Sequence, residues 1–358
     1  MPTGNATPDY FGGHRTEVMD RYASSIVAID AKTGLTRWHF QTTHHDIWDY
    51  DVPSQPTLVD LNLDGLIRKA VIVPTKRGEL FMLDRATGDP LTEIVEREVP
   101  QTDLPDERSS PTQPFSSGMP SFAHPRLSER DLFGITPFDQ MACRKAFYNL
   151  RYEGPMTPPS IRGTLHYPGP AGGMNWGSVA VDEERQLMVV NNLHLAWTIH
   201  MIPREDVVRE ARTGASAGFG IGGPQRGTPF AARVGMFASP VGLPCLKPPY
   251  GEIAVVDLTS QKILWRRGVG PLNLGFPFTA GSFVTASGLI FNAGVIDGQL
   301  RAIDTLTGDT VWQSKLRSAS DATPMSYVSP TTGRQYVLVT VPGNRQTGGS
   351  VIAYALAE

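Results

Sequence analysis

The sequence predicts an all-β protein made of repeated antiparallel sheets, a β-propeller with long loop insertions. Four segments repeat a β-branched strand, an aspartate, a short turn and a returning strand. The spacing is 54 residues between the first two aspartates and 47 between the last two, which is typical of propeller blades. Glycine and proline, with 36 and 30 residues, are spread along the chain, as expected of a many-turned β protein.

Each repeat has the same turn chemistry. The repeated aspartates are Asp30, Asp84, Asp257 and Asp304. In three repeats a glycine follows four residues later, and in three a tryptophan follows eight residues later. The glycine supplies positive φ at the hairpin turn, and the aspartate accepts hydrogen bonds from the turn's backbone N–H groups. The tryptophan would fill the space between neighbouring sheets.

The 173 residues between the second and third repeats predict one further blade and two insertions. The blade is placed at residues 172–191, where two apolar strands flank an acidic turn. Residues 93–170 are rich in proline and are expected to form a long excursion with one helix, Asp139–Leu150, capped by its aspartate. Residues 206–250 are rich in glycine and predict a second long loop. The predicted domains are therefore blades over 1–92, an insertion over 93–170 and the remaining blades over 171–358.

Composition excludes some classes of protein. The chain is 40% hydrophobic and 19% charged, which is ordinary for a soluble globular protein. A net charge of -3 argues against a nucleic-acid partner. No run of 18 apolar residues is present, and the first residues lack the features of a signal peptide. If the protein works outside the cytoplasm, we expect its targeting signal on a part of the polypeptide that is not in this sequence.

The chain has two cysteines, Cys143 and Cys245. Their spacing fits no zinc site, so they are either two buried thiols or one disulfide. Spacing does not reveal the Cα separation, and both alternatives stay open.

Residues 44–53, with the sequence HHDIWDYDVP, carry the strongest chemical signal. The first eight hold two imidazoles, three carboxylates and two aromatic rings. Burial and mutual repulsion push the pKa values of such carboxylates apart, so that one becomes a base while another serves as a ligand or an orienting group. Taken alone, the motif is also compatible with a solvated loop plugged by a tryptophan.

This motif, followed 27 residues after Asp49 by Lys76, resembles the membrane-bound quinoprotein dehydrogenases. That family, of the glucose, quinate and shikimate type, depends on pyrroloquinoline quinone (PQQ). The resemblance covers nearly the whole chain, and further matching segments are residues 5–16, 140–144, 151–154, 242–245 and 322–327. It implies an eight-bladed propeller, of which this chain would be the C-terminal half or somewhat more. The membrane helices, the early blades and some metal ligands would lie on a portion missing from this chain.

The resemblance implies oxidation of a polyol or a cyclic polyhydroxy acid by hydride transfer to PQQ, assisted by Ca²⁺ or Mg²⁺. Electrons would pass to ubiquinone at the periplasmic face of the bacterial inner membrane. Asp49 matches the family's catalytic aspartate, and Asp46 is the second candidate for the base. Carboxylate oxygens suit a hard cation, so Asp49 is also the possible metal ligand, and the other ligands stay unknown.

Three residues match family positions that contact the cofactor: Lys76, Asn191 and Asp297. The Lys76 ammonium would attract the carboxylates of PQQ, and without cofactor we expect it to be unpaired and to add little to stability. Asn175 is a weaker alternative to Asn191. Asp297 precedes a glycine and is equally compatible with a simple turn.

Three residues are expected near the substrate mouth: His44, His45 and Asn344. The histidines line the mouth, orient the acidic cluster or cap a turn, and these alternatives stay open. Asn344 stands where glucose-oxidising members of the family tend to have histidine. Because asparagine does not titrate, the sequence favours quinate, shikimate or another polyol over glucose.

Two other classes compete with the enzyme. One is a non-catalytic propeller that scaffolds outer-membrane assembly and shares the strand repeats without a cofactor. The other is a cofactor-less remnant of a longer gene. The acidic motif and Lys76 favour the enzyme, because a scaffold does not need ionisable groups gathered in one place. No predicted strand is followed by Gly-x-Gly-x-x-Gly, the motif that would indicate a nicotinamide cofactor.

Overall fold

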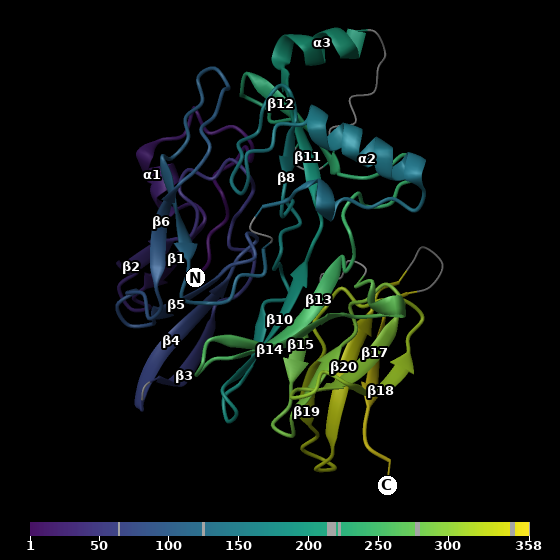
Figure 1. The fold of residues 1–358 in the computed structure, drawn as a ribbon. Helices are drawn as coiled ribbons and strands as arrows, with labels where there is room; N and C mark the ends of the chain where they lie inside the picture. The colour runs from purple at the N-terminus through teal and green to yellow at the C-terminus, as the bar shows by residue number, and fades with distance from the viewer. Residues whose placement is uncertain are drawn as a thin grey trace. The chain divides into compact units, whose positions relative to one another are not determined.

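The computed structural model describes residues 1–63, 65–123, 126–212, 220, 223–275, 280–343 and 348–357, and most of its elements are antiparallel strands (Figure 1). The chain forms two compact units, each assembled from three segments. Unit 1 comprises Met1–Pro53, Thr75–Gly173 and His194–Lys247, and unit 2 comprises Ser54–Pro74, Met174–Leu193 and Pro248–Glu358. Among the described residues, no helix has the length and apolar character needed to cross a membrane.

Unit 2 is a series of antiparallel sheets. Its first hairpin pairs β3 (Thr57–Leu63) with β4 (Leu66–Pro74). A four-stranded sheet in the order β14-β13-β10-β9 contains β9 (Val179–Asp182), β10 (Leu187–Leu193), β13 (Gly251–Asp257) and β14 (Lys262–Gly268). The short 3-10 helix η2 (Pro271–Asn273) follows it. The next sheet runs in chain order through β15 (Ser282–Val284), β16 (Leu289–Asn292), β17 (Gln299–Asp304) and β18 (Thr310–Lys315). The last contains β19 (Met325–Val328), β20 (Gln335–Val341) and β21 (Ser350–Tyr354).

Unit 1 holds shorter sheets and the helices. It begins with α1 (Glu17–Tyr22), the hairpin of β1 (Ser25–Ile29) and β2 (Thr36–Gln41), and β5 (Leu80–Asp84). The segment 93–170 adds the hairpin of β6 (Ile94–Glu98) and β7 (Thr112–Ser116), η1 (Glu129–Asp131), α2 (Pro137–Asn149) and β8 (Thr164–His166). The remaining elements are β11 (Trp197–Pro203), α3 (Arg204–Arg212) and β12 (Phe230–Met236). Strands β12, β11 and β8 form one sheet, and α2 lies beside it (Figure 1).

The predicted turn chemistry of the repeats is confirmed. In all four, Oδ1 of the repeated aspartate accepts hydrogen bonds from the backbone N–H groups two and three residues later. The glycines of three repeats, Gly34, Gly88 and Gly308, have φ of 73°, 81° and 75°. In the third repeat Gln261 takes this place with φ of 58°.

Two of the three tryptophans, Trp38 and Trp265, pack as expected against the turn of the next repeat, whereas Trp312 is 42% exposed. A Cβ atom added to Gly308 would lie 3.0 Å from the indole of Trp265, and one added to Gly88 would lie 2.6 Å from that of Trp38. Nε1 of Trp265 also donates to the carbonyl of Thr305 at 2.8 Å. The glycine therefore serves two needs, positive φ and room for the indole.

The predicted separate blade at residues 172–191 is wrong. Strands β9 and β10 pair with β13 and β14 in one sheet, and residues 194–250 leave that sheet between two neighbouring strands. Every residue of β10 is buried, which fits a strand with a partner on each side. Val189 pairs with Val255 in the middle of this sheet, and both belong to its apolar core.

The two predicted loops contain regular structure. The segment 93–170 holds a hairpin, a helix and a strand, and the segment 206–250 holds most of α3 and all of β12. Pro114 lies within β7, a strand of a two-stranded hairpin, where proline is tolerated because one edge makes no ladder hydrogen bonds. Proline content therefore concealed this hairpin.

The predicted helix is present as α2, but its cap differs. Thr136 is the N-cap residue, and its Oγ1 accepts a hydrogen bond from the N–H of Asp139 at 3.1 Å. Asp139 is therefore not the cap, and its Oδ2 accepts from the N–H of Ile135 at 3.2 Å. Cys143 of this helix forms a disulfide with Cys245, with a Cα separation of 5.5 Å, which settles the open alternative.

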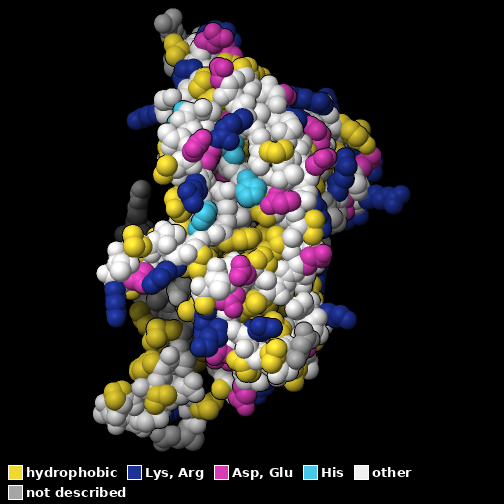
Figure 2. All heavy atoms as spheres, turned by 90° about the vertical axis from the view of Figure 1, so that its left-hand side faces the viewer, with side chains coloured by type: hydrophobic (Ala, Val, Ile, Leu, Met, Phe, Trp, Pro, Cys, Tyr) yellow, Lys and Arg dark blue, Asp and Glu magenta, His cyan; other side chains and the backbone are white. Residues whose placement is uncertain are grey.

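Charge is dispersed on the face drawn in Figure 2. Lysine and arginine side chains alternate there with aspartate and glutamate, and the described residues form no continuous basic area on this face. This distribution agrees with the net charge of -3.

Candidate functional site

Asp46 organises the loop of residues 44–53. It is fully buried, and its Oδ1 accepts hydrogen bonds from the N–H groups of Trp48 at 2.9 Å and Tyr50 at 3.1 Å. Its Oδ2 accepts from Oγ of Ser24 at 2.6 Å, and Arg15 donates to its backbone carbonyl at 2.5 Å. Burial raises the pKa of Asp46 despite these bonds. Since both carboxylate oxygens are engaged, Asp46 serves to hold the loop's shape.

The two aromatic residues of the loop anchor it in the core. Nε1 of Trp48 donates to the carbonyl of Thr157 at 2.9 Å, and Oη of Tyr50 donates to that of Pro168 at 2.5 Å. Both rings are buried and stack with centroids 6.4 Å apart. The alternative of a solvated loop is therefore wrong.

Asp49 and Lys76 meet as the sequence predicts. Nζ of Lys76 lies 2.9 Å from Oδ1 of Asp49 and 2.8 Å from Oδ1 of Asp51. These side chains are only 10%, 15% and 20% exposed. A Cβ atom on Gly172 would lie 2.6 Å from Cγ of Lys76, so the glycine gives the lysine stem its room. The expectation of an unpaired lysine is wrong, because two carboxylates hold it.

Asp49 has an uncommon backbone conformation. Its φ is +62°, in the left-handed region, and such a conformation at a residue other than glycine costs on the order of 1–3 kcal/mol. The hydrogen bonds from Trp48 and Tyr50, its two neighbours, to Asp46 hold the backbone on either side. The loop therefore fixes the direction in which the Asp49 carboxylate points.

The electrostatics give Asp49 and Lys76 different protonation behaviour. Burial raises the pKa of Asp49 to about 7, the charges of Asp51 and Asp46 add to this, and Lys76 opposes it. Burial alone would lower the pKa of Lys76, but Asp49 and Asp51 outweigh it and raise that pKa. Near neutral pH the site thus combines a permanent ammonium with a carboxylate that readily gains or loses a proton.

Two residues beside this cluster have buried side-chain polar atoms without a hydrogen-bond partner in the described part of the chain. Neither ring nitrogen of His166 is bonded, although its side chain is buried and its ring lies 4.8 Å from that of Tyr50. Burial and the nearby Lys76 lower the pKa of His166 to about 3, so the imidazole is neutral. Oη of Tyr10 is also unbonded, and burial with the charge of Asp49 raises its pKa. Unbonded buried groups are costly and mark places that suit a polar ligand.

The histidines of the motif make different contacts. His45 is buried, with Nδ1 2.8 Å from Oδ2 of Asp20 and Nε2 3.0 Å from Oε1 of Glu107. Burial lowers its pKa, but these carboxylates outweigh that and raise it. Asp20 and Glu107 lie outside the motif of residues 44–53, so the suggested roles of His45 stay predictions. His44 is half-buried and lies 3.1 Å from Glu96, and its role at the mouth stays a prediction.

The other predicted residues belong to unit 2. Oδ1 of Asn191 accepts from Oγ of Ser282 at 2.9 Å, and the carboxylate of Asp297 forms an ion pair with the buried Arg301. Asn175 accepts a hydrogen bond from the N–H of the next residue. Asn344 lies outside the described residues. The structure brings Asp49 and Lys76 together in unit 1, while Asn191 and Asp297 are held by partners within unit 2.

A metal site is not formed by the described residues alone. They include no group of three or more histidine, cysteine, aspartate or glutamate side chains that could hold a metal ion. Asp49 therefore stays a predicted ligand whose companions are unknown.

Comparisons with known proteins identify the family of the chain. The family model of the PQQ glucose/ethanol/alcohol dehydrogenase β-propeller domain matches residues 1–337. The whole chain is 41% identical to a probable quinate dehydrogenase (quinone) of Xanthomonas campestris pv. juglandis, of which it covers 48%. It is 40% identical to the quinate/shikimate dehydrogenase (quinone) of Acinetobacter baylyi and 38% identical to the quinoprotein glucose dehydrogenase of Escherichia coli, covering 47% of each.

The solved structures support the fold alone. The crystal structure of quinohemoprotein alcohol dehydrogenase from Comamonas testosteroni matches 99% of this chain and 46% of its own, with a TM-score of 0.61 at 22% identity. The chain spans about half the length of the relatives that it matches. With the turn repeats, the sheets and the family match together, the chain belongs to the family of PQQ glucose/ethanol/alcohol dehydrogenase β-propeller domains.

Proposed function

We propose that this chain forms the catalytic part of a quinoprotein dehydrogenase that oxidises a CH–OH group of a polyol or a cyclic polyhydroxy acid. The observation that carries the proposal is the largely desolvated Asp49 carboxylate, with a pKa of about 7, held 2.9 Å from the Lys76 ammonium. Family membership adds the cofactor class, PQQ, and the relatives' names add quinate, shikimate and glucose as substrates of those proteins.

Asp49 is the general base of this reaction. It accepts the proton of the substrate hydroxyl while PQQ, when bound, supplies the hydride acceptor. A positioned base contributes roughly 10²–10⁴ in rate, and its efficiency is greatest when its pKa lies near the working pH. The strained backbone of Asp49 and its pairing with Lys76 keep the carboxylate in one orientation before substrate arrives.

The residues around Asp49 suit an anionic cofactor with carbonyl oxygens. Lys76 provides a permanent positive charge, and Tyr10 and His166 provide buried polar atoms that have no partner among the described residues. Asn191 and Asp297 are proposed as further cofactor contacts from the match of their positions to the family. The metal, Ca²⁺ or Mg²⁺, would take Asp49 as one ligand and its others from elsewhere in the polypeptide.

Quinate or shikimate is the preferred substrate class, with glucose second. The preference rests on Asn344, because an asparagine at that place cannot titrate as the histidine of glucose-oxidising members does. Ubiquinone is the electron acceptor, and the complete polypeptide works at the periplasmic face of the inner membrane. The Asp49 carboxylate, with its pKa of about 7, favours the enzyme over a non-catalytic scaffold, because a scaffold does not need such a group.

Reconstitution tests the proposal. The full-length polypeptide, prepared free of cofactor, is incubated with PQQ and Ca²⁺ or Mg²⁺ and assayed with quinate, shikimate and glucose and an artificial electron-accepting dye. We expect oxidation only after both additions, with quinate or shikimate the better substrate. Activity that needs a nicotinamide, or none with PQQ and either metal, would refute the proposal.

A further inference from the structure

Unit 1 contains a cavity of about 430 Å³ that the chemistry above does not use. This volume lies in the range of small-molecule sites, roughly 300–1,000 Å³. Tyr50 and Arg77 line the cavity, whereas Asp49, Asp51 and Lys76, their neighbours in the chain, contact one another. The cavity and the Asp49 site are therefore built from alternate residues of the same two segments.

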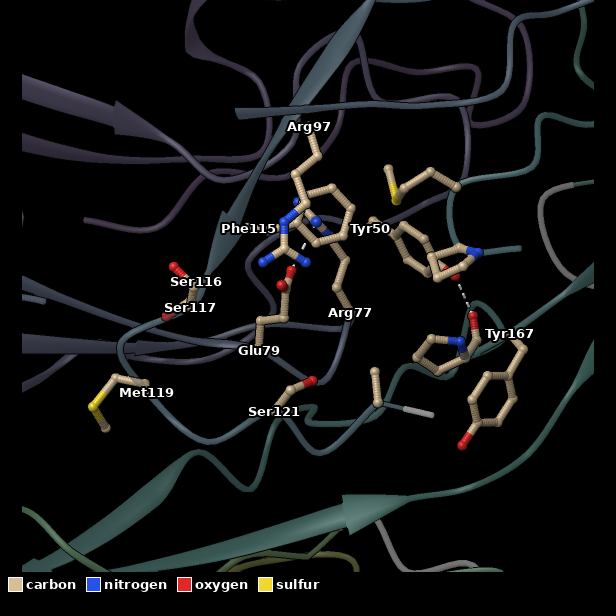
Figure 3. Close-up of a pocket in the computed structure, with 14 residues that line it drawn as sticks. Tyr50, Arg77, Glu79, Arg97, Phe115, Ser116, Ser117, Met119, Ser121 and Tyr167 are labelled. Carbon is tan, nitrogen blue, oxygen red and sulfur yellow. Dashed lines mark hydrogen bonds and ion pairs between the residues drawn. The ribbon is translucent and has the colours of Figure 1, made fainter. Parts of the chain in front are cut away.

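The polar wall of the cavity has an excess of positive charge. The guanidinium carbons of Arg77 and Arg97 lie 4.7 and 5.1 Å from the centre of the Phe115 ring. Glu79 is buried and pairs with Arg77 at 2.7 Å (Figure 3). Arg97 has no ion pair within 4 Å to any residue that the structure describes. Its guanidinium is thus the donor group available to a ligand.

The rest of the wall is largely apolar and partly aromatic. The rings of Tyr50 and Phe115 and the side chains of Met119 and Met156 contribute to it, and the two methionines are buried. Tyr50 cannot donate to a ligand without losing its 2.5 Å bond to the carbonyl of Pro168, drawn in Figure 3. Thioether side chains adapt to irregular ligands and contact aromatic rings favourably. The exposed hydroxyl of Ser121 adds one further polar group.

These features select one ligand chemistry. A flat ring contacts the rings of Phe115 and Tyr50 where they line the cavity, an acceptor oxygen at its edge meets Arg97, and apolar substituents contact the methionines. A polyhydroxylated ring fits poorly, because hydroxyl groups against the apolar wall would stay without hydrogen bonds. A benzoquinone ring with carbonyl oxygens and alkyl substituents meets all three requirements.

We propose that this cavity binds the head group of a quinone. Its role as the place of electron transfer rests on the proposed function, but the binding itself does not. A bound quinone becomes a hydroquinone by taking two electrons, which the reduced cofactor supplies, and two protons from solvent. The ring of Tyr50 lines the cavity, and its backbone joins the two aspartates that hold Lys76, so one residue links the two sites.

Equilibrium dialysis of the cofactor-free chain against decyl-ubiquinone tests the binding. We expect saturable binding, a dissociation constant raised at least tenfold by Arg97→Gln, and loss of binding in Ser121→Phe, whose ring would occupy the cavity. Arg68→Gln changes an exposed arginine of β4 in unit 2 and should bind as wild type does. Melting temperatures establish that each variant is folded.

The proposal is overturned if Arg97→Gln and Ser121→Phe both bind quinone as tightly as wild type. It is also overturned if the chain binds quinate and not quinone, and Arg97→Gln weakens the binding of quinate. In the reconstituted full-length polypeptide, Arg97→Gln should keep dye-linked oxidation and lose at least nine-tenths of quinone-linked oxidation. Quinone binding without any PQQ-dependent activity would refute the proposed function alone, whereas dye-linked activity without quinone binding would refute this inference alone.

Discussion

Aspartates occupy two contrasting regions of this protein, the turns of the repeats and the loop of residues 44–53. In the turns the aspartate is half-buried and its carboxylate accepts backbone N–H groups, which lower the pKa of Asp304. In the loop the Asp49 side chain is 15% exposed, its partner is the Lys76 ammonium, and desolvation raises its pKa to about 7. The same side chain is structural where backbone donors satisfy it and reactive where burial disfavours its charge.

Asp46 shows that burial alone does not make a reactive carboxylate. It is more deeply buried than Asp49, yet three hydrogen bonds from Ser24, Trp48 and Tyr50 engage both of its oxygens. The difference between these neighbours is therefore the supply of donors. Substituting an aspartate of the turns and an aspartate of the loop measures how much this supply of hydrogen-bond donors matters.

The largest effect is expected at Asp49. In the reconstituted full-length polypeptide, Asp49→Asn should lower kcat by at least about a hundredfold while PQQ affinity is kept, because the base is lost and positioning remains. The matched control is Asp304→Asn, which changes a turn carboxylate and should leave kcat within about twofold. Undiminished activity in Asp49→Asn would move the role of base to another residue.

The next effect concerns Lys76. A charge-assisted bond to the cofactor is worth roughly 1.5–3 kcal/mol, so Lys76→Ala should raise the dissociation constant of PQQ about ten- to a hundredfold. Lys76→Arg should recover part of the loss, because its charge remains but its geometry differs.

The same variant tests the pairing of Lys76 in the cofactor-free state. Lys76→Ala should lower the melting temperature, because Asp49 and Asp51 lose their shared counter-ion. Lys262→Ala, at an exposed position of β14, is the control for both measurements. Three matching PQQ titration curves for wild type, Lys76→Ala and Lys76→Arg would exclude a cofactor contact.

A smaller effect is the pH dependence of stability. The folded-state pKa of Asp49, about 7, lies above its unfolded value of 3.8, so the folded state binds the extra proton between these values. The extra proton stabilises the folded state at low pH, and this contribution to the free energy of unfolding is lost as pH rises through about 7. Between pH 5 and 8.5 the free energy of unfolding of Asp49→Asn should therefore gain about 1–3 kcal/mol relative to wild type.

Asp304→Asn is the control, because the pKa of Asp304 is shifted in the opposite direction from that of Asp49. Because the folded-state pKa of Asp304 is lowered, its contribution is present above its unfolded pKa and is lost only in acid. Its difference from wild type should stay constant between pH 5 and 8.5. Urea unfolding measures the free energy of each variant relative to wild type at the two pH values. If this difference stays constant for Asp49→Asn as it does for Asp304→Asn, the proposed titration of Asp49 is contradicted.

The smallest effect is expected at a turn. Asp84→Ala removes the acceptor for the N–H groups of Ala86 and Thr87 and should lower the free energy of unfolding by about 1 kcal/mol. PQQ affinity should not change. Urea unfolding and PQQ titration on one preparation check both statements, and a change in affinity would show that turns and site are coupled.

The repeats could be predicted because their information is local. A strand, an aspartate and a glycine within a few residues determine a hairpin, and each of the four turns forms as expected. The merging of β10 with β13 was not predictable in the same way. That pairing joins strands about sixty residues apart, and local patterns do not specify which apolar strands become neighbours.

In the candidate site, too, some residues could be predicted from the sequence and others could not. Asp49 and Lys76 were found from their motif and spacing together with the resemblance to a known family. His166 and Tyr10 were missed, because a single histidine in a strand and a tyrosine before a phenylalanine carry no pattern. Only the folded chain shows that both are buried with unbonded polar atoms. The pairing of Lys76 with Asp51 also depends on the turn of the loop and not on spacing.

The disulfide closes a long covalent loop in the chain. Cys143 and Cys245 are 102 residues apart, and the loop that they close contains the strands β8, β9, β10, β11 and β12 and the helix α3. A single cut in any peptide bond between the two cysteines therefore releases no fragment while the disulfide is intact. Proteolysed protein of this kind would migrate as one chain on a non-reducing gel and separate into two pieces only after a reductant is added.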